Sequence, residues 1–294
     1  MTTNSPKPFG GDPLGRSTPR WAEPGQERSP RESAASAIAL RYVAPVLGLA
    51  LVFGGWELYV RLTGVSPITL PPPSRIIRHL AAEPTFYLRN GWITLWEAMI
   101  GFFIALAVAL VVAAAMAHWR FAERATMPVI VLIQSTPVAV LAPVFLLWFG
   151  FSPTPKVLVA ALFAFVPFVA NALTGFRSVD ADTLEVMRSV DASSWEVLWR
   201  LRLRYATPSL FAAARICVGL ALVGAVIGEL YGGSTAGLGY QARTAQARSL
   251  VDQLWGSVLS LALVGIILTL LVMMLERRLL RWHISQASLN RSKR

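Results

Sequence analysis

Long apolar runs separated by short polar segments dominate the pattern of hydrophobic and polar positions along the chain. Six such runs occur, at about 42–62, 92–117, 127–149, 156–176, 209–230 and 254–275. A helix rises about 1.5 Å per residue, so each run is long enough to cross about 30 Å of hydrocarbon. The pattern predicts an all-α integral membrane protein with six transmembrane helices.

The two ends of the chain lack this pattern. Residues 1–36 are rich in Pro, Gly, Ser, Arg and Glu and cannot bury a core, so we expect a disordered tail there. Residues 284–294 form a second, short and basic tail. The expected organisation is one six-span domain over residues 37–283 with a tail at each end.

One polar segment interrupts the apolar pattern between the fourth and fifth runs, over residues 177–208. Asp182 with Glu185, and Ser193 with Glu196, have the spacing of a helix capping box. These two starts predict two short helices with a turn between them.

The first of these helices, at about residues 182–190, has one apolar face. Leu184, Met187 and Val190 recur every three residues, and the turn after them falls near Asp191. A polar helix this short needs tertiary contacts to persist in water. It suits insertion into a groove on another protein, and the alternative is a loop that packs under its own helices.

Composition and charge agree with a membrane protein. The chain is 55% hydrophobic and 15% charged, whereas a soluble domain carries about 25% charged residues. Nineteen of the 27 Lys and Arg residues lie on the side of the predicted topology that holds both termini and the segment 177–208. This bias places that side in the cytoplasm, with the chain in the cell membrane. The net charge of +11 indicates contact with anionic lipid heads rather than nucleic acid, because no nucleic-acid-binding motif accompanies it.

Few residues could support chemistry. Cys217 is the only cysteine and lies within an apolar run, and the histidines His79, His118 and His283 lie beside different runs. We therefore expect no metal site and no histidine-based catalytic centre. No G-x-x-x-x-G-K-[ST] motif occurs, so we expect no nucleotide on this chain, and the glycine-rich segment 232–239 suits a flexible outer loop.

Prolines and polar residues within the runs are candidates for a pathway through the membrane. Proline removes a backbone donor and kinks a helix, and polar side chains in lipid need partners. The candidates are Gln134, Pro137, Pro143, Pro167, Asn171 and Thr174 in the third and fourth runs, and Glu229 at the end of the fifth. Hydrogen bonding between helices and lining of a pathway are both open as roles for these positions.

Two further features lie on the predicted outer side. Glu57 and Arg61 are four residues apart on one helix face and should pair, and Glu97 should be paired or reach the membrane surface. The segment 69–80 should begin extended at its three prolines and continue as a short helix on the membrane surface.

The polar segment 177–208 resembles the coupling loop of ATP-binding-cassette (ABC) importer permeases, in particular the nitrate/sulfonate/taurine-type branch. The family's pattern EAARSLGAS corresponds to EVMRSVDAS at residues 185–193. Other segments similar to the family are LPPPS (70–74), LAP (141–143), WFGF (148–151), GFRSVD (175–180), IGE (227–229), GLGY (237–240) and LERR (275–278). Together they span about residues 51–283, nearly everything except the tails.

The resemblance implies a permease subunit with the type I importer fold. Two such subunits, by default a homodimer, would form the pathway. Two cytoplasmic ABC ATPase subunits would hold ATP and Mg, and an extracytoplasmic solute-binding protein would deliver the substrate. This chain would then contribute no catalytic residue and bind no cofactor. The alternative is a secondary transporter or a channel not coupled to ATP.

The resemblance also assigns residues to contact with the ATPase. These are Asp182, Leu184, Glu185, Val186, Met187, Arg188, Ser189, Val190, Asp191, Ala192 and Ser193. Asp191 stands where the family has glycine, so we expect a left-handed aspartate at the turn. Arg204 stands where the family has proline, which should soften the break before the fifth span. A thiamine pyrimidine precursor, riboflavin, a sulfonate, taurine and nitrate are the candidate substrates.

Overall fold

The computed structural model describes residues 30–231 and 233–280. These residues form helices joined by short connections, with no strand among them, which confirms the all-α prediction. The elements are α1 (Pro30–Thr63), α2 (Pro73–Ala82), α3 (Pro84–His118), α4 (Arg120–Ser135), η1 (Val138–Val140), α5 (Leu141–Phe149), α6 (Thr154–Arg177), α7 (Ala181–Ser189), α8 (Ser194–Glu196), η2 (Val197–Arg202), α9 (Leu203–Tyr231), α10 (Leu238–Ala247) and α11 (Val251–Leu279). The chain divides into two units between Gly55 and Trp56, within α1. The C-terminal tail and residues 1–29 lie outside the described residues, and α1 already begins at Pro30.

Long apolar helices account for the predicted membrane spans. Five are long and apolar enough to cross a membrane, namely Val43–Thr63, Pro84–His118, Thr154–Arg177, Ser194–Tyr231 and Val251–Leu279. A sixth crossing results if α4 and α5, which bend by 79° at the break between them, are counted as one span. Several helices extend beyond the apolar runs, because a helix continues into polar flanks until a cap or a proline ends it.

The third predicted span is a broken helix. α4 ends at Ser135, and Thr136 is extended, with φ −83° and ψ 130°. Pro137 follows, and a proline disfavours helical geometry in the residue before it. Pro143 lies in the first turn of α5, where no amide hydrogen is needed, and α6 continues through Pro167. Of the three prolines expected to kink helices, only Pro137 stands at an interruption.

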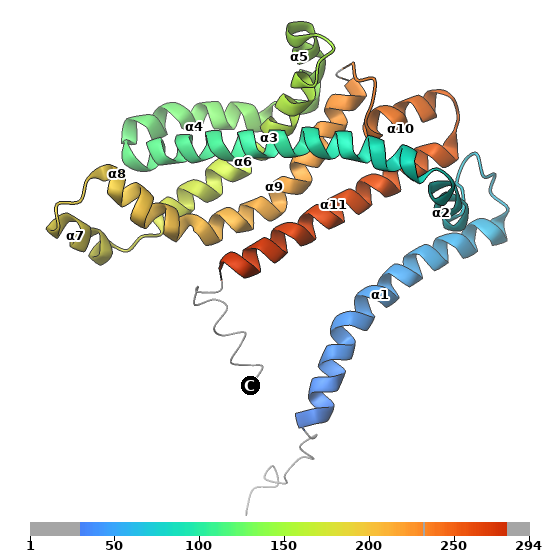
Figure 1. The fold of residues 1–294 in the computed structure, drawn as a ribbon, viewed down its shortest axis with the longest axis horizontal. Coiled ribbons are helices and arrows are strands. Elements are labelled where there is room, and N and C mark those ends of the chain that lie inside the picture. The colour runs from blue at the N-terminus through green and yellow to red at the C-terminus, as the bar shows by residue number, and fades with distance from the viewer. Residues whose placement is uncertain (1–29, 232, 281–294) are drawn as a thin grey trace, which may run out of the picture. The chain divides into compact units, whose positions relative to one another are not determined.

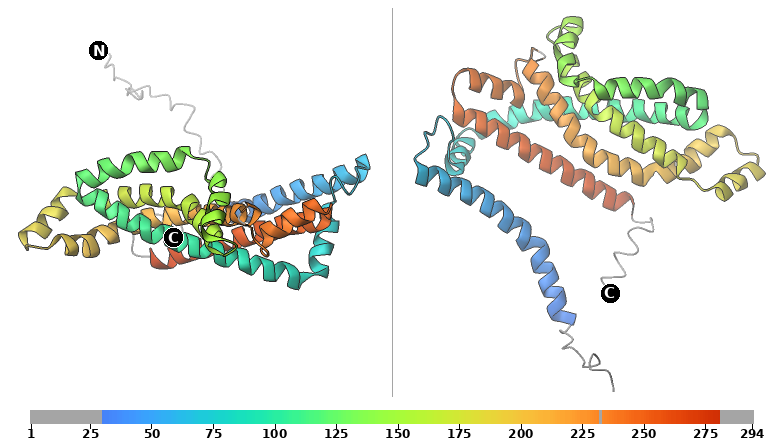
Figure 2. Two further views of the ribbon diagram at one scale, coloured as in Figure 1. Left: turned by 90° about the horizontal axis from the view of Figure 1, so that it is seen from above. Right: turned by 180° about the vertical axis from the view of Figure 1, so that it is seen from behind.

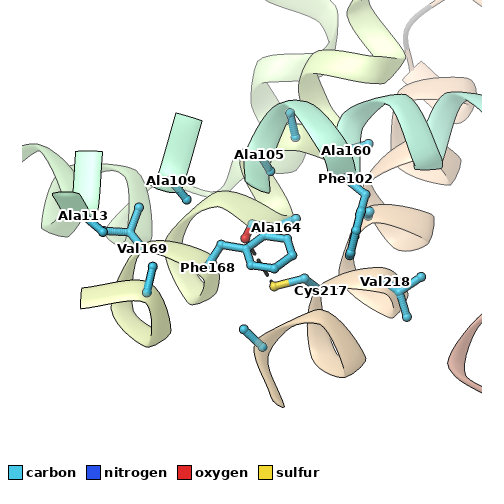
Figure 3. Packing of buried hydrophobic residues seen from close by; sticks show 14 of the residues in the cluster. Phe102, Ala105, Ala109, Ala113, Ala160, Ala164, Phe168, Val169, Cys217 and Val218 are labelled. Carbon is cyan, nitrogen blue, oxygen red and sulfur yellow. Dashed lines mark hydrogen bonds between the residues drawn. The ribbon is translucent and has the colours of Figure 1, made fainter. Parts of the chain in front are cut away.

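The core of the Trp56–Leu280 unit is where α6 packs against α3 and α9 (Figures 1 and 2). Small side chains line these contacts, so the helices approach closely. The Phe102 and Phe168 rings meet edge to face with centroids 5.1 Å apart, and the Cys217 thiol donates to the Ala164 carbonyl at 3.4 Å (Figure 3). The small buried residues around them include Ala105, Ala109, Ala113, Ala160, Ala172, Ala213 and Ala221.

Glycine is required at the closest approaches to α6. A Cβ at Gly101 of α3 would lie 2.6 Å from the Ala160 Cβ of α6. On α9, Cβ atoms at Gly224 and Gly228 would lie 2.6 Å from the Cα atoms of Ala160 and Lys156. Any side chain at these three positions would push the helices apart.

The ends of this unit carry different short helices. α7 lies at one end, whereas α2 and α10 lie at the opposite end (Figures 1 and 2). The short helix predicted in the segment 69–80 is confirmed as α2, preceded by Pro72 in extended geometry. Its place on the membrane surface stays a prediction. Its Ile76 is fully buried in the protein, whereas the neighbouring Ile77 is exposed. Within this unit, α3, α6 and α9 run between these two ends (Figure 1), which is the arrangement expected of helices that cross a membrane.

Candidate functional site

The polar segment after α6 contains a short helix with a side-chain cap. The N-cap of α7 is Asp180, whose carboxylate accepts the backbone N–H of Thr183 at 2.7 Å. The cap predicted at Asp182 is therefore wrong, and Asp182 lies in the first helical turn. Hydrogen bonds from the Thr183 side chain and backbone hold the pKa of Asp180 below its usual range. Asp180 consequently caps α7 as a carboxylate at neutral pH.

α7 ends in the left-handed turn predicted at Asp191. Asp191 has φ 52°, and its N–H donates to the Arg188 carbonyl at 3.0 Å. The N–H of Ala192 donates to the Met187 carbonyl, also at 3.0 Å. These two bonds form a Schellman motif, the arrangement in which glycine is the usual left-handed residue. Both ends of α7 are thus fixed by hydrogen bonds.

The next helix begins where predicted but does not end as a short helix. Ser193 and Glu196 form the expected capping box. The helix then runs without interruption through η2, a π-helical stretch, and α9, so that Ser194–Tyr231 is one long helix and Pro208 lies within it. The prediction of a separate second short helix is therefore wrong. Arg204, unlike the proline of the family pattern, keeps the backbone donor that continues the helix.

The two faces of α7 have different surroundings. Leu184 and Arg188, one turn apart, line a groove against the C-terminal end of α3. Val186 and Val190, also one turn apart, are 62% and 68% exposed, and Glu185 is exposed beside them. The predicted apolar stripe is therefore divided, because Leu184 faces its own chain whereas Val190 is open. The exposed residues of this segment that do not line the groove include Glu185, Val186 and Val190.

The remaining predicted coupling residues are spread around this helix and its turn. Asp182, Ser189, Asp191 and Ser193 are exposed, whereas Met187 and Ala192 are half-buried. They lie on α7 or in the turn that follows it.

The candidate pathway residues fall on separate elements. Pro167, Asn171 and Thr174 follow one another at helical spacing along α6, on a side that is half-buried or exposed. The Asn171 amide donates to the Pro167 carbonyl and the Thr174 hydroxyl to the Ala170 carbonyl, both within α6. In the described part of the chain these two side chains therefore make no hydrogen bond between helices. Gln134, Pro137 and Pro143 are exposed around the break between α4 and α5.

A buried ion pair joins α3 to α6. Lys156 Nζ donates to Glu97 Oε1 at 2.7 Å and to Ser234 Oγ at 3.2 Å. Lys156 is 7% exposed and Glu97 is 3% exposed. The expectation that Glu97 is paired is confirmed, but the sequence pattern did not identify Lys156 as its partner. The available signal was that Lys156 stands at the very start of the fourth apolar run, where a lone lysine needs a counter-ion.

Glu229 is fully buried beside this pair. One of its carboxylate oxygens accepts the Thr94 hydroxyl at 2.6 Å, and the other accepts the N–H of Gly239. The Thr94 oxygen in turn accepts the N–H of Leu238 at 2.9 Å. Side chains of α3 and α9 thus bind the first backbone donors of α10, which has no cap of its own.

Gly237 completes this junction. Its N–H donates to Asn90 Oδ1 at 3.1 Å, and it has φ 104°, a conformation that favours glycine. A Cβ here would overlap the Glu229 carboxylate. The expectation of a flexible outer loop is therefore wrong for Gly237 to Gly239, which are buried and hydrogen-bonded. We name Glu97, Lys156, Glu229 and Thr94 the buried polar cluster; they lie at the end of the unit that carries α10.

The other predicted contact, between Glu57 and Arg61, is confirmed near the C-terminal end of α1. Arg61 pairs with Glu57 at 2.6 Å, and the Glu57 carboxylate also accepts the backbone N–H of Ser74 in α2 at 3.0 Å. This carboxylate therefore joins α1 to the start of α2.

Comparison with known proteins assigns this helical chain to one family. Residues 105–282 match the model of that family, described as the binding-protein-dependent transport system inner membrane component. The chain belongs to this family. It is an ABC importer permease, a multi-pass membrane protein whose family supplies transport subunits that work with ATPase and solute-binding partners.

Three relatives show the branch. The formylaminopyrimidine transport permease protein ThiX of Halalkalibacterium halodurans is 30% identical over 243 residues, 82% of this chain and 96% of ThiX. The riboflavin transport system permease protein RibX of Chloroflexus aurantiacus is 34% identical over 253 residues, 83% of this chain and 93% of RibX. The taurine transport system permease protein TauC of Escherichia coli is 29% identical over 245 residues, 80% of this chain and 88% of TauC. The expected nitrate/sulfonate/taurine-type branch is therefore confirmed.

Proposed function

We propose that this permease forms the substrate pathway of an ATP-driven importer and is coupled to a separate cytoplasmic ATPase through α7. The observation that carries this proposal is the construction of α7. Its two ends are fixed by the Asp180 cap and the turn at Asp191, while Val186 and Val190 are open to a partner. An amphipathic helix of this kind suits a groove on another protein, and a helix fixed at both ends moves as a rigid lever.

The proposed assembly has two copies of this chain, two ATPase subunits and one extracytoplasmic binding protein. ATP and Mg bind to the ATPase, and both termini of the permease lie in the cytoplasm, in agreement with the Lys and Arg bias. We place the pathway along the side of α6 that carries Pro167, Asn171 and Thr174. The opposite side of α6 is buried against α3 and α9, so this side is the one left for a cavity or for the second copy.

The substrate we propose is a small solute of the kinds named for the relatives. ThiX, RibX and TauC are named for formylaminopyrimidine, riboflavin and taurine, which favours a thiamine pyrimidine precursor, riboflavin, taurine or another sulfonate, with nitrate as the inorganic candidate. Isothermal titration of the cognate binding protein with each of these solutes tests the assignment. Binding of none of them would contradict it.

Coupling through α7 is tested by reversing the charge of Glu185. Glu185→Arg should abolish co-purification of the ATPase and ATP-dependent uptake, because it places a cation on the exposed surface of α7. Glu83→Arg makes the same change at an exposed position at the opposite end of the unit and should leave co-purification unchanged. Normal assembly and transport by Glu185→Arg would show that α7 does not dock onto the ATPase.

Orientation is tested by cysteine labelling. The only native cysteine, Cys217, is buried, so it should give little background. Ser189→Cys on α7 should react with a membrane-impermeant maleimide only in inside-out vesicles, and Ser66→Cys, at an exposed outer position, only in intact cells. Labelling of Ser189→Cys from outside the cell would reverse the proposed topology.

A further inference from the structure

A groove of about 660 Å³ lies between the C-terminal end of α3 and the segment that contains α7. We name it the α3–α7 groove. Its volume falls in the range of about 300–1,000 Å³ that is typical of ligand pockets. Three residues that the family resemblance assigns to ATPase contact, Leu184, Arg188 and Ala192, line this groove. The exposed residues Glu185, Val186 and Val190, on which the proposed coupling to the ATPase depends, do not line it.

The α3 side of the groove is apolar and shallowly hollowed. Val111, Ala114 and Ala115 line it, and the two alanines leave space that a larger residue would fill. From Val111 to the end of α3 at His118 the helix rises about 10 Å, since each residue adds about 1.5 Å. The groove therefore reaches from the end of a membrane-spanning helix into its hydrocarbon-facing part.

The opposite part of the groove is positively charged. Arg188 and Arg202 line it together with His118, and no carboxylate is among its described lining residues. Arg202 Nη1 donates to the Ala117 carbonyl at 3.1 Å, which fixes this guanidinium against α3. Arg188 forms no ion pair within the described residues. The groove thus offers two guanidinium groups to an external anion.

Two tryptophans place this groove at the membrane surface. Trp119 and Trp195 both line it and are 60% and 65% exposed. Exposed tryptophans of membrane proteins concentrate at the headgroup level. The groove is therefore an amphipathic site, with an apolar part on α3, two arginines and two exposed tryptophans. Its charged end is level with the lipid headgroups.

We propose that the α3–α7 groove binds a phospholipid with an anionic headgroup, its phosphate at Arg188 and Arg202 and an acyl chain along Val111, Ala114 and Ala115. Basic pockets between helices on the cytoplasmic side are a recognised setting for such headgroups. The inference uses the proposed function only to place the groove in the cytoplasmic leaflet. Because Arg188 belongs to α7, the bound lipid would join α7 to α3 and steady the position of the coupling helix.

The test measures lipid retention by the full-length permease. The protein is reconstituted in nanodiscs of phosphatidylcholine with phosphatidylglycerol, and bound lipid is counted by native mass spectrometry after release. Each arginine near an anionic headgroup is worth about 1 kcal/mol, so Arg188→Gln and Arg202→Gln should each weaken phosphatidylglycerol retention about fivefold. Ala114→Leu should weaken it without changing any charge, because the added side chain fills the hollow.

A matched control is Arg200→Gln. Arg200 is exposed on the same helix as Arg202, is paired with Glu196 at 3.5 Å, and does not line the groove. The Arg200→Gln variant should retain as much phosphatidylglycerol as the wild type. Equal retention by wild type, Arg188→Gln and Ala114→Leu would overturn the proposal, as would retention of phosphatidylcholine equal to that of phosphatidylglycerol.

Binding of the ATPase distinguishes a failure of the lipid proposal from a failure of the proposed function. Glu185→Arg should lose the ATPase but keep phosphatidylglycerol, since Glu185 does not line the groove. Displacement of phosphatidylglycerol by added ATPase would show that the groove is part of the ATPase socket, which would overturn the lipid site. Failure of the wild-type permease to bind any ATPase while it retains phosphatidylglycerol would instead contradict the proposed function.

Discussion

Removal of the Lys156 ammonium should leave the buried polar cluster with two buried carboxyl groups and no cation. Lys156→Met keeps much of the length of the side chain and removes its charge. The Lys156–Glu97 distance is 2.7 Å, and the two residues are 7% and 3% exposed. Glu229, the other carboxyl group of the cluster, is fully buried. Removing one partner of such a buried pair typically destabilises a protein by about 3–5 kcal/mol, because the other charge remains desolvated.

A second ion pair separates the effect of burial from that of distance. Arg61 and Glu57 are 2.6 Å apart, as close as Lys156 and Glu97, but the Arg61 side chain is 69% exposed. Arg61→Met should therefore change the stability little, since water replaces the lost partner. The two variants form a matched pair, because each replaces the cation of an ion pair by methionine and the two ion pairs have nearly equal N–O distances.

The measurement is the free energy of unfolding of the purified permease, from titration with sodium dodecyl sulfate followed by tryptophan fluorescence. The double variant Glu97→Gln, Lys156→Met should recover a large part of the loss, because the neutral amide removes the unpaired charge. A Lys156→Met variant as stable as Arg61→Met, or a double variant no more stable than Lys156→Met, would refute the argument that burial makes this pair strong.

Three further predictions concern the backbone. Gly228→Ala should destabilise the permease by about 1–3 kcal/mol, since its Cβ would meet α6, whereas Gly219→Ala, with nothing within 4 Å, should not; the same titration compares them. Asp191→Gly should raise the free energy of unfolding by about 1 kcal/mol, since glycine adopts φ 52° without strain, and a loss of stability would contradict the left-handed turn. Asp180→Ala should lower the protection of α7 amides from hydrogen exchange, and Asp180→Asn should keep most of it. The pKa of Asp180 in the folded protein is below its ordinary value of 3.8. The cap therefore stabilises α7 fully above pH 3.8, and this stabilisation is lost as the pH falls through the folded pKa. In Asp180→Asn, which does not titrate, the protection should not change as the pH is lowered.

The sequence alone was sufficient for the features that depend on neighbouring residues. The six apolar runs predict the spans because each run by itself decides whether a helix is stable in lipid. The Ser193–Glu196 box and the turn at Asp191 were predictable because their hydrogen bonds join residues at most five positions apart. The extent of the second capped helix was not, since Pro208 signals a break that the long helix does not make.

Tertiary structure decided the features that depend on distant residues. Lys156 and Glu97 are 59 positions apart, and Thr94 and Glu229 are 135 positions apart, so no local pattern relates them. The close packing of α3, α6 and α9 brings these side chains into one buried site, where each polar group must find a partner within the protein. Tertiary structure also decides that Leu184 and Arg188 of α7 line a groove with the end of α3, whereas Val186 and Val190 are exposed. Apolar periodicity shows that a helix has distinct faces, but the neighbouring helices determine which face is covered.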